Sequence, residues 1–145
     1  MLTRFQQIIN PPYALHDACI HQILCQNDRV CLQCRYEWTA EPYPQGNGSV
    51  TLEKVDLDSS CVLLLSRFGR YGVFQGKKLT LSEFLHRYDA YSFEITDELY
   101  GYHQVEYIGY LSFPNKDDHI QMSLSFCFDG DIVYETEEPC ERNLK

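Results

Sequence analysis

Apolar and polar residues alternate most regularly at positions 120–128. Ile120, Met122, Leu124, Phe126 and Phe128 occupy every second position, and small or polar residues fill the gaps. Successive side chains of an extended chain point to opposite sides, so this spacing gathers the apolar set on one surface, whereas a helix would scatter it. The pattern predicts a central β-strand with one face in a hydrophobic core.

The segments next to this strand are predicted to pair with it. Residues 103–113 return through a loop at 114–117, in a register that sets Leu111 opposite Ile120 and Val105 opposite Phe126. A slip of one residue would place Glu106 against Phe126, and the apolar faces would no longer coincide. After Asp129-Gly130, which is typical of a turn, residues 132–136 are expected to complete a three-strand meander.

Residues 15–36 form the pattern of a second hairpin. With Asn27-Asp28 at its tip, the register pairs Cys19 with Tyr36 and His21 with Cys34. Both pairs would lie on the face that also carries Ile23 and Leu32, which we expect to be the buried one. Asn and Asp suit a tight turn because they tolerate positive φ.

The remaining pattern is less regular. Residues 41–49 contain two Pro and two Gly and are predicted to form a loop. Strands are predicted at 50–57, 60–66 and 71–75, with a turn at Gly76-Lys77, and a further strand from 91 that breaks at 96–98.

The clearest helix signal lies at 80–88. Thr80 and Glu83 have the spacing of a capping box, and an apolar stripe follows at helical intervals. A shorter helix is expected at 3–9, and the polar residues 137–145 are expected to form a flexible tail. The predicted fold class is therefore mainly β, from all-β to α+β. We expect a single domain over 1–145, an antiparallel sheet or sandwich of about eight strands with one short helix.

Composition and targeting signals limit the setting. Apolar residues make up 44% of the 145 residues and aromatics 14%, which is a composition that folds. No apolar run approaches the roughly 20 residues needed to span a bilayer. The first residues lack the apolar core of a signal peptide, so a cytoplasmic location is expected. In that reducing compartment the seven cysteines are expected to be free thiols.

Charge is distributed unevenly along the chain. Residues 1–90 carry nine acids and nine bases, so the whole net charge of −9 lies in residues 91–145. Residues 67–87, in contrast, carry a net positive charge. A strongly acidic segment repels nucleic acid and anionic membranes and attracts basic proteins. The alternative is that the charge only keeps a small domain soluble.

Few residues have the spacing of a chemical site. Cys31 and Cys34 have the spacing of zinc ligands, but on a strand they would point to opposite faces, so no metal or other cofactor is predicted. His21 opposite Cys34 would be a candidate nucleophile pair, although a core histidine with a backbone partner is the more common situation. Tyr100, Tyr102, Tyr107 and Tyr110 form an aromatic cluster suited to sheet packing or to a protein interface. The chain is not expected to be an enzyme.

The opening of the first hairpin resembles a known group of proteins. Residues 15–23 read Leu-His-Asp-Ala-Cys-Ile-His-Gln-Ile, and Asn-Asp-Arg-Val-Cys-Leu follows at 27–32. This pattern is similar to that of small, poorly characterised bacterial β proteins, some of which are regarded as immunity partners of secreted toxins. The resemblance implies a hairpin and transfers no functional residue.

Together these patterns predict a cytosolic protein-binding domain, immunity-like in kind, that docks a basic partner. The acidic residues expected to contact this partner are Glu94, Asp97, Glu98, Glu106, Asp117 and Asp118. The alternatives are a self-associating β domain that forms a homodimer without ligand and, as the weakest, an enzyme that uses His21 and Cys34.

Overall fold

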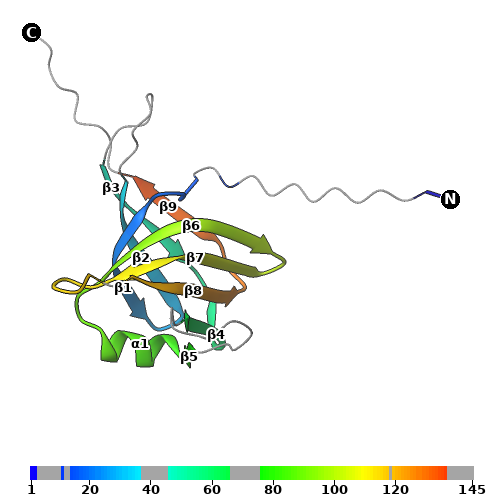
Figure 1. Ribbon diagram of the computed structural model, residues 1–145. Helices are drawn as coiled ribbons and strands as arrows, with labels where there is room; N and C mark the ends of the chain where they lie inside the picture. The colour runs from blue at the N-terminus through cyan, green and yellow to red at the C-terminus, as the bar shows by residue number, and fades with distance from the viewer. Residues whose placement is uncertain (3–10, 12–13, 37–45, 66–75, 118, 137–145) are drawn as a thin grey trace, which may run out of the picture.

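The computed structural model describes residues 1–2, 11, 14–36, 46–65, 76–117 and 119–136. Nine strands and one helix occupy these residues (Figure 1). They are β1 Cys19–Gln26, β2 Arg29–Tyr36, β3 Gly46–Leu52, β4 Val55–Leu65, β5 Gly76–Leu79, α1 Leu81–Arg87, β6 Ser92–Gly101, β7 Gln104–Ser112, β8 His119–Phe128 and β9 Ile132–Thr136. The predicted class is confirmed: the described chain is mainly β, with one short helix.

All nine strands belong to one antiparallel sheet, in the order β5-β4-β8-β7-β6-β1-β2-β3-β9. Strand β3 continues into β4 through a short corner, and β8 continues into β9 in the same way. Glu53 and Gly130 face each other at these corners, where the Gly130 N–H donates to the Glu53 carbonyl over 3.1 Å. Because β3 pairs with β9 while β4 pairs with β8, the ladder returns to its starting point and the sheet closes around a shared interior.

The interior is filled by the inward residues of every long strand. Met122, Leu124 and Phe126 of β8 are buried, as the alternation at 120–128 predicts, while Ile120 and Phe128 at the ends are partly buried. Removing this much apolar surface from water is the main force that holds the sheet closed. The central prediction is thus confirmed.

The register between β7 and β8 is also confirmed. Leu111 faces Ile120 and Val105 faces Phe126. Gly109 faces Met122, and a Cβ at Gly109 would lie 1.8 Å from the backbone carbonyl oxygen of Glu94. No side chain fits there, so glycine at position 109 lets β6 approach β7 more closely than any other residue would.

The helix begins and ends as expected. The Thr80 hydroxyl accepts a hydrogen bond from the Glu83 N–H over 3.1 Å, which satisfies one of the free donors of the first turn. Phe84 is fully buried and its ring contacts Tyr91 with centroids 5.3 Å apart. Tyr91 in turn accepts the Ile23 N–H of β1 over 2.9 Å. Tyr91 therefore provides a partner for β1 beyond Cys19 and Ile20, where β1 no longer pairs with β6.

Several predicted boundaries differ from the structure. The predicted turn at Gly76-Lys77 is strand β5, and β3 begins at Gly46 inside the predicted loop. The predicted strands 50–57 and 60–66 are replaced by β3 and β4, which meet at the corner near Glu53. The proposed meander is wrong in its last step, because β9 pairs with β3 rather than with β8. The predicted helix at 3–9, strand at 71–75 and tail at 137–145 lie outside the described residues.

A β-bulge at His21 explains the largest error in the first hairpin. From Gln22 to Arg29 the observed register agrees with the prediction, and Asn27 has the positive φ expected at the tip. Beyond the bulge the register shifts by one residue, so Cys34 faces Ile20 and Cys19 faces Arg35. Ile20 is buried in place of His21, which lies exposed at the surface.

Candidate protein-binding face

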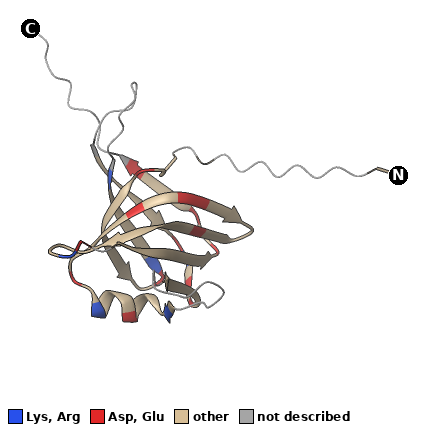
Figure 2. Cartoon of the chain, viewed as in Figure 1, with Lys and Arg blue, Asp and Glu red and all other residues tan. Residues whose placement is uncertain are grey.

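The outward side of the β6–β7 ladder carries acidic and large apolar side chains together. Three cross-strand pairs lie along it: Glu94 with Tyr110, Asp97 with Ile108, and Leu99 with Glu106. We call these six residues the acidic face. Glu94 and Asp97 are exposed, and acidic residues are visible along β6 and β7 in Figure 2.

A second β-bulge determines which residues reach this face. The register shifts between Ile95 and Asp97, and the Thr96 hydroxyl donates to the Ile108 carbonyl over 3.1 Å at the irregularity. Without the extra residue, Glu98 would share the outward side with Glu94, since strand side chains alternate. With it, Asp97 and Leu99 point outward and Glu98 points inward. The predicted strand break at 96–98 is therefore a bulge in a continuous strand.

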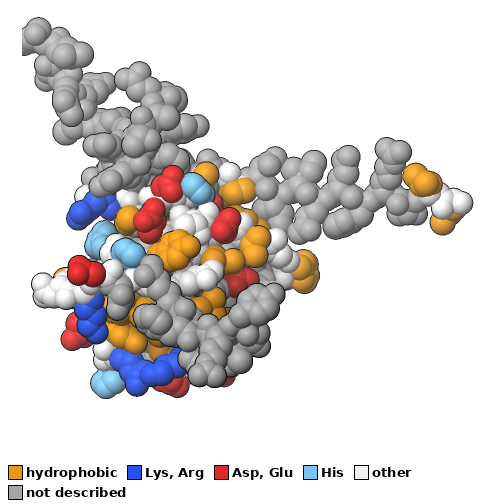
Figure 3. All heavy atoms as spheres, in the orientation of Figure 1, with side chains coloured by type: hydrophobic (Ala, Val, Ile, Leu, Met, Phe, Trp, Pro, Cys, Tyr) orange, Lys and Arg blue, Asp and Glu red, His pale blue; other side chains and the backbone are white. Residues whose placement is uncertain are grey.

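The exposed apolar side chains distinguish this face from an ordinary solvated one. Leu99 is 55% exposed and Tyr110 46% exposed, and Tyr102 at the β6–β7 turn is 92% exposed. Acidic and hydrophobic side chains are interspersed over this part of the molecule in Figure 3. Tyrosine combines a large contact area with a hydrogen-bonding group, and it is enriched at protein interfaces.

The six acids predicted from the sequence do not form one cluster. Glu94, Asp97 and Glu106 lie together on the acidic face, where Glu106 is partly buried and accepts a hydrogen bond from the Ser123 hydroxyl. Asp117 lies in the β7–β8 connection, beyond the opposite end of β7 from Glu106. Asp118 lies outside the described residues.

Glu98 belongs instead to an inward cluster with three tyrosines. Its carboxylate accepts the Tyr100 hydroxyl over 2.6 Å and the Leu15 N–H over 2.9 Å. Burial raises the pKa of Tyr100 well above its usual value, and Tyr107 and the bond to Glu98 add to the effect. Tyr134 interacts with Tyr100, and burial raises its pKa as well. We call Glu98, Tyr100, Tyr107 and Tyr134 the tyrosine cluster.

One hydroxyl in the tyrosine cluster is buried without a hydrogen bond of good geometry. Tyr107 is fully buried, and its hydroxyl oxygen has no hydrogen-bond partner of good geometry among the described residues. Burial raises the pKa of Tyr107, Tyr134 and the Glu98 carboxylate add to the rise, and Tyr100 partly offsets it. The sequence signal for this cluster is the run of tyrosines in 100–110, but alternation alone does not show that Tyr100 turns inward.

The predicted histidine–cysteine pair is not brought together. Cys34 is buried and its thiol donates to the Leu32 carbonyl, whereas His21 lies on the outside at the bulge. Within the described ranges, no three His, Cys, Asp or Glu residues are close enough to hold a metal ion. No helix in that part of the chain is long and apolar enough to cross a membrane.

Comparison with known proteins adds no further information. No protein family, curated protein or solved structure matches this chain.

Proposed function

We propose that this protein is a non-catalytic binding domain that docks a basic protein partner on its acidic face. The observation that carries the proposal is the shared outward side of β6 and β7, where Glu94 and Asp97 alternate with the exposed Leu99 and Tyr110. Charges of one sign steer an oppositely charged partner toward the face. Exposed apolar groups then stabilise the contact once water is excluded.

The resemblance at residues 15–32 suggests a specific form of this function. An immunity protein neutralises a toxin by covering it, and basic nucleases are bound well by acidic surfaces because charge complementarity speeds association. We propose that the partner is a basic toxin domain encountered in the cytoplasm. The net charge of −9 supports a partner of positive charge and opposes a nucleic acid ligand.

The proposal is tested by reversing charge on the acidic face. The double variant Glu94→Lys, Asp97→Lys is compared with Asp58→Lys, Asp131→Lys, which changes the net charge equally at exposed positions outside the acidic face, in β4 and in the β8–β9 corner. The partner is captured from the native cell, identified by mass spectrometry, and its affinity measured with the purified proteins. We expect the first variant to lose at least tenfold in affinity and the control less than threefold.

Two further measurements separate docking from unspecific attraction. Affinity should fall as salt rises from 50 to about 500 mM, because the Debye length shortens from more than 10 Å to a few ångström. Leu99→Ser should also weaken binding, since a general electrostatic field would not depend on one apolar side chain. Equal losses in the control and the face variants would refute the proposal, as would binding that is indifferent to Leu99.

A further inference from the structure

The His21 side chain lines two hollows in the surface of the molecule. The first, of about 410 Å³, is lined by Gln33, Arg35, Asn47, Ser49 and Glu135 from strands β2, β3 and β9. We call it the polar hollow. The second, of about 500 Å³, is lined by Asp89, Tyr91, Ser92, Ser112 and Phe113. We call it the aromatic hollow.

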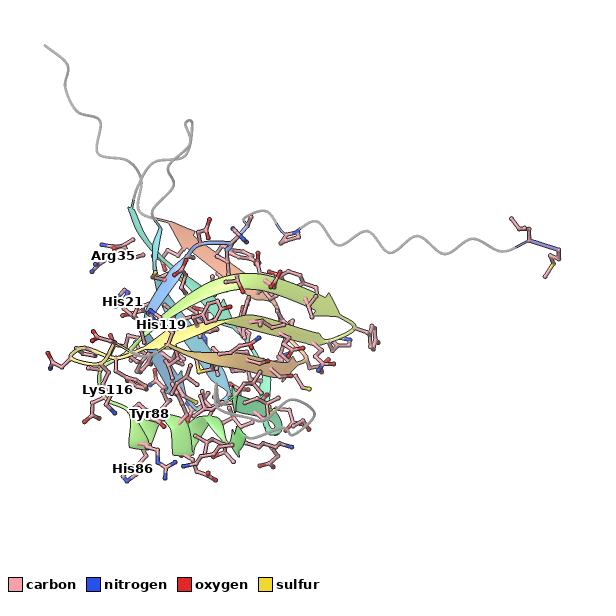
Figure 4. The ribbon with its side chains drawn as sticks, in the orientation of Figure 1. His21, Arg35, His86, Tyr88, Lys116 and His119 are labelled. Atoms are coloured by element: carbon pink, nitrogen blue, oxygen red, sulfur yellow. The ribbon has the colours of Figure 1, made fainter. Side chains whose placement is uncertain are left out.

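The bulge at His21 creates this arrangement. It turns the imidazole outward at the place where β1 leaves β6, since β1 pairs with β6 only at Cys19 and Ile20. Bulges commonly re-aim a side chain next to a functional site. In Figure 4, Arg35 and His21 lie along the same side of the molecule.

The polar hollow offers side-chain hydrogen-bond donors that no other described residue uses. Ion pairs in the described ranges are limited to His16 with Asp17 and His103 with Asp129, so Arg35 has no carboxylate partner there. Gln33 faces Ser49, and Arg35 faces Asn47, on adjacent strands. A guanidinium beside two amides and a hydroxyl is well suited to a carboxylate, which it binds through two parallel hydrogen bonds.

The acids of the two hollows limit how much negative charge a ligand can carry. Glu135 lies in the polar hollow and Asp89 in the aromatic hollow, and both are exposed. Their repulsion disfavours phosphates and dicarboxylates, whereas a single carboxylate at Arg35 lies close to only one of them. The aromatic hollow supplies the rings of Tyr91 and Phe113 for an apolar body. The Lys116 ammonium already lies 5.6 Å from the centroid of the Phe113 ring, so a ligand that packs on this ring must bind beside the ammonium or displace it.

We propose that the two hollows around His21 form a binding site for a small organic monocarboxylate with an apolar or aromatic body. The carboxylate binds Arg35 and its neighbours in the polar hollow, and the body passes His21 into the aromatic hollow. Together the hollows have the size of ordinary small-ligand sites. The site is independent of the proposed protein partner, because Arg35 and His21 lie outside the acidic face.

The test uses three defined probes and the histidine signals of the folded protein. With isotope-labelled histidine, the chain gives five imidazole signals, one of them from His21. We expect 4-phenylbutyrate to shift the His21 signal saturably, with a Kd on the order of 1 mM for a ligand of this size. Butyrate lacks the ring and 4-phenylbutylamine carries the opposite charge, and both should bind at least fivefold more weakly.

Matched variants complete the test. Arg35→Gln should weaken 4-phenylbutyrate binding at least tenfold, whereas Arg29→Gln removes an equal charge from the other end of β2 and should leave the affinity within twofold. An amine that binds as well as the acid would overturn the proposal. So would a shift shared equally by all five histidines, or no saturable shift at roughly 20 mM probe, well above the expected Kd. The Asp97→Lys variant should bind the probe normally, which separates this result from the fate of the protein-binding proposal.

Discussion

Two tyrosines of the tyrosine cluster should respond oppositely to the loss of a hydroxyl group. Tyr100→Phe removes the donor that the Glu98 carboxylate accepts over 2.6 Å, and leaves that carboxylate with the Leu15 N–H. Hydrogen bonds to charged groups contribute about 1.5–3 kcal/mol. Because Glu98 is only partly buried, water replaces some of the lost interaction, and we expect a loss near the lower limit, about 1.5 kcal/mol.

Tyr107→Phe should leave the free energy of unfolding unchanged or raise it. The Tyr107 hydroxyl is buried without a good hydrogen bond among the described residues, so the folded state already bears the cost of its desolvation. Removing the hydroxyl returns part of that cost, which is about 1–3 kcal/mol for a buried unsatisfied group. Lost contacts around the oxygen reduce the gain. We expect a change between zero and about 1 kcal/mol in favour of the folded state.

The two variants are compared by urea unfolding at pH 7, followed by circular dichroism. A difference of about 2 kcal/mol corresponds to roughly 30-fold in the unfolding equilibrium, and to about 1 M between the urea midpoints. Tyr110→Phe, at a position 46% exposed, is the control and should change little. Equal losses in both inward variants, or a larger loss for Tyr107→Phe, would show that the Tyr107 hydroxyl has a partner of consequence.

Three more predictions follow from other parts of the molecule. Gly109→Ala should lower the free energy of unfolding by about 3 kcal/mol or more, because the new Cβ would lie 1.8 Å from the Glu94 carbonyl oxygen and the β6–β7 ladder must shift. Urea unfolding measures this loss, and a value below about 1 kcal/mol would contradict that packing. Thr80→Ala should cost about 1 kcal/mol by removing the cap of α1, while Thr80→Ser should restore most of it. The contribution of the tyrosine cluster to stability should be constant below about pH 10 and should fall above it. Unfolding lowers the raised pKa of these tyrosines, so the unfolded chain loses protons that the folded chain keeps, at about 1.4 kcal/mol per pH unit for each tyrosine. Spectrophotometric titration at 295 nm checks this, and tyrosines that all ionise near pH 10 in the folded protein would contradict it.

The sequence predicts those features of the fold that depend on unbroken alternation or local capping. The β7–β8 register is correct because matching apolar sets on both strands leave only one favourable alignment, from Val105 with Phe126 to Leu111 with Ile120. The helix is correct because Thr80 and Glu83 signal its start within a few residues. The closure of the sheet is not predictable in this way. It depends on β9 reaching β3, a contact between residues about 80 positions apart that no local pattern specifies.

His21 and Glu98 lie on the opposite side of their strands from the one that the sequence predicts, because a period of two carries no information about an inserted residue. In β1 the bulge places Ile20 in the core where the sequence predicts His21, so His21 does not pair with Cys34. The exposed His21 imidazole lines two hollows instead. In β6 the bulge at Thr96 removes Glu98 from the acidic face and brings Leu99 to it.

Each bulge therefore changes the chemistry of the surface without changing the composition of the strand. An unbroken β6 would expose Glu94 and Glu98 and would bury Leu99, giving a face that attracts cations but has little apolar area to retain a partner. The observed β6 exposes Asp97 and Leu99 instead, and turns Glu98 toward the Tyr100 hydroxyl and the Leu15 N–H, which satisfy its carboxylate. Long-range attraction and short-range apolar contact then act on the same surface, and that combination is what a docking face requires.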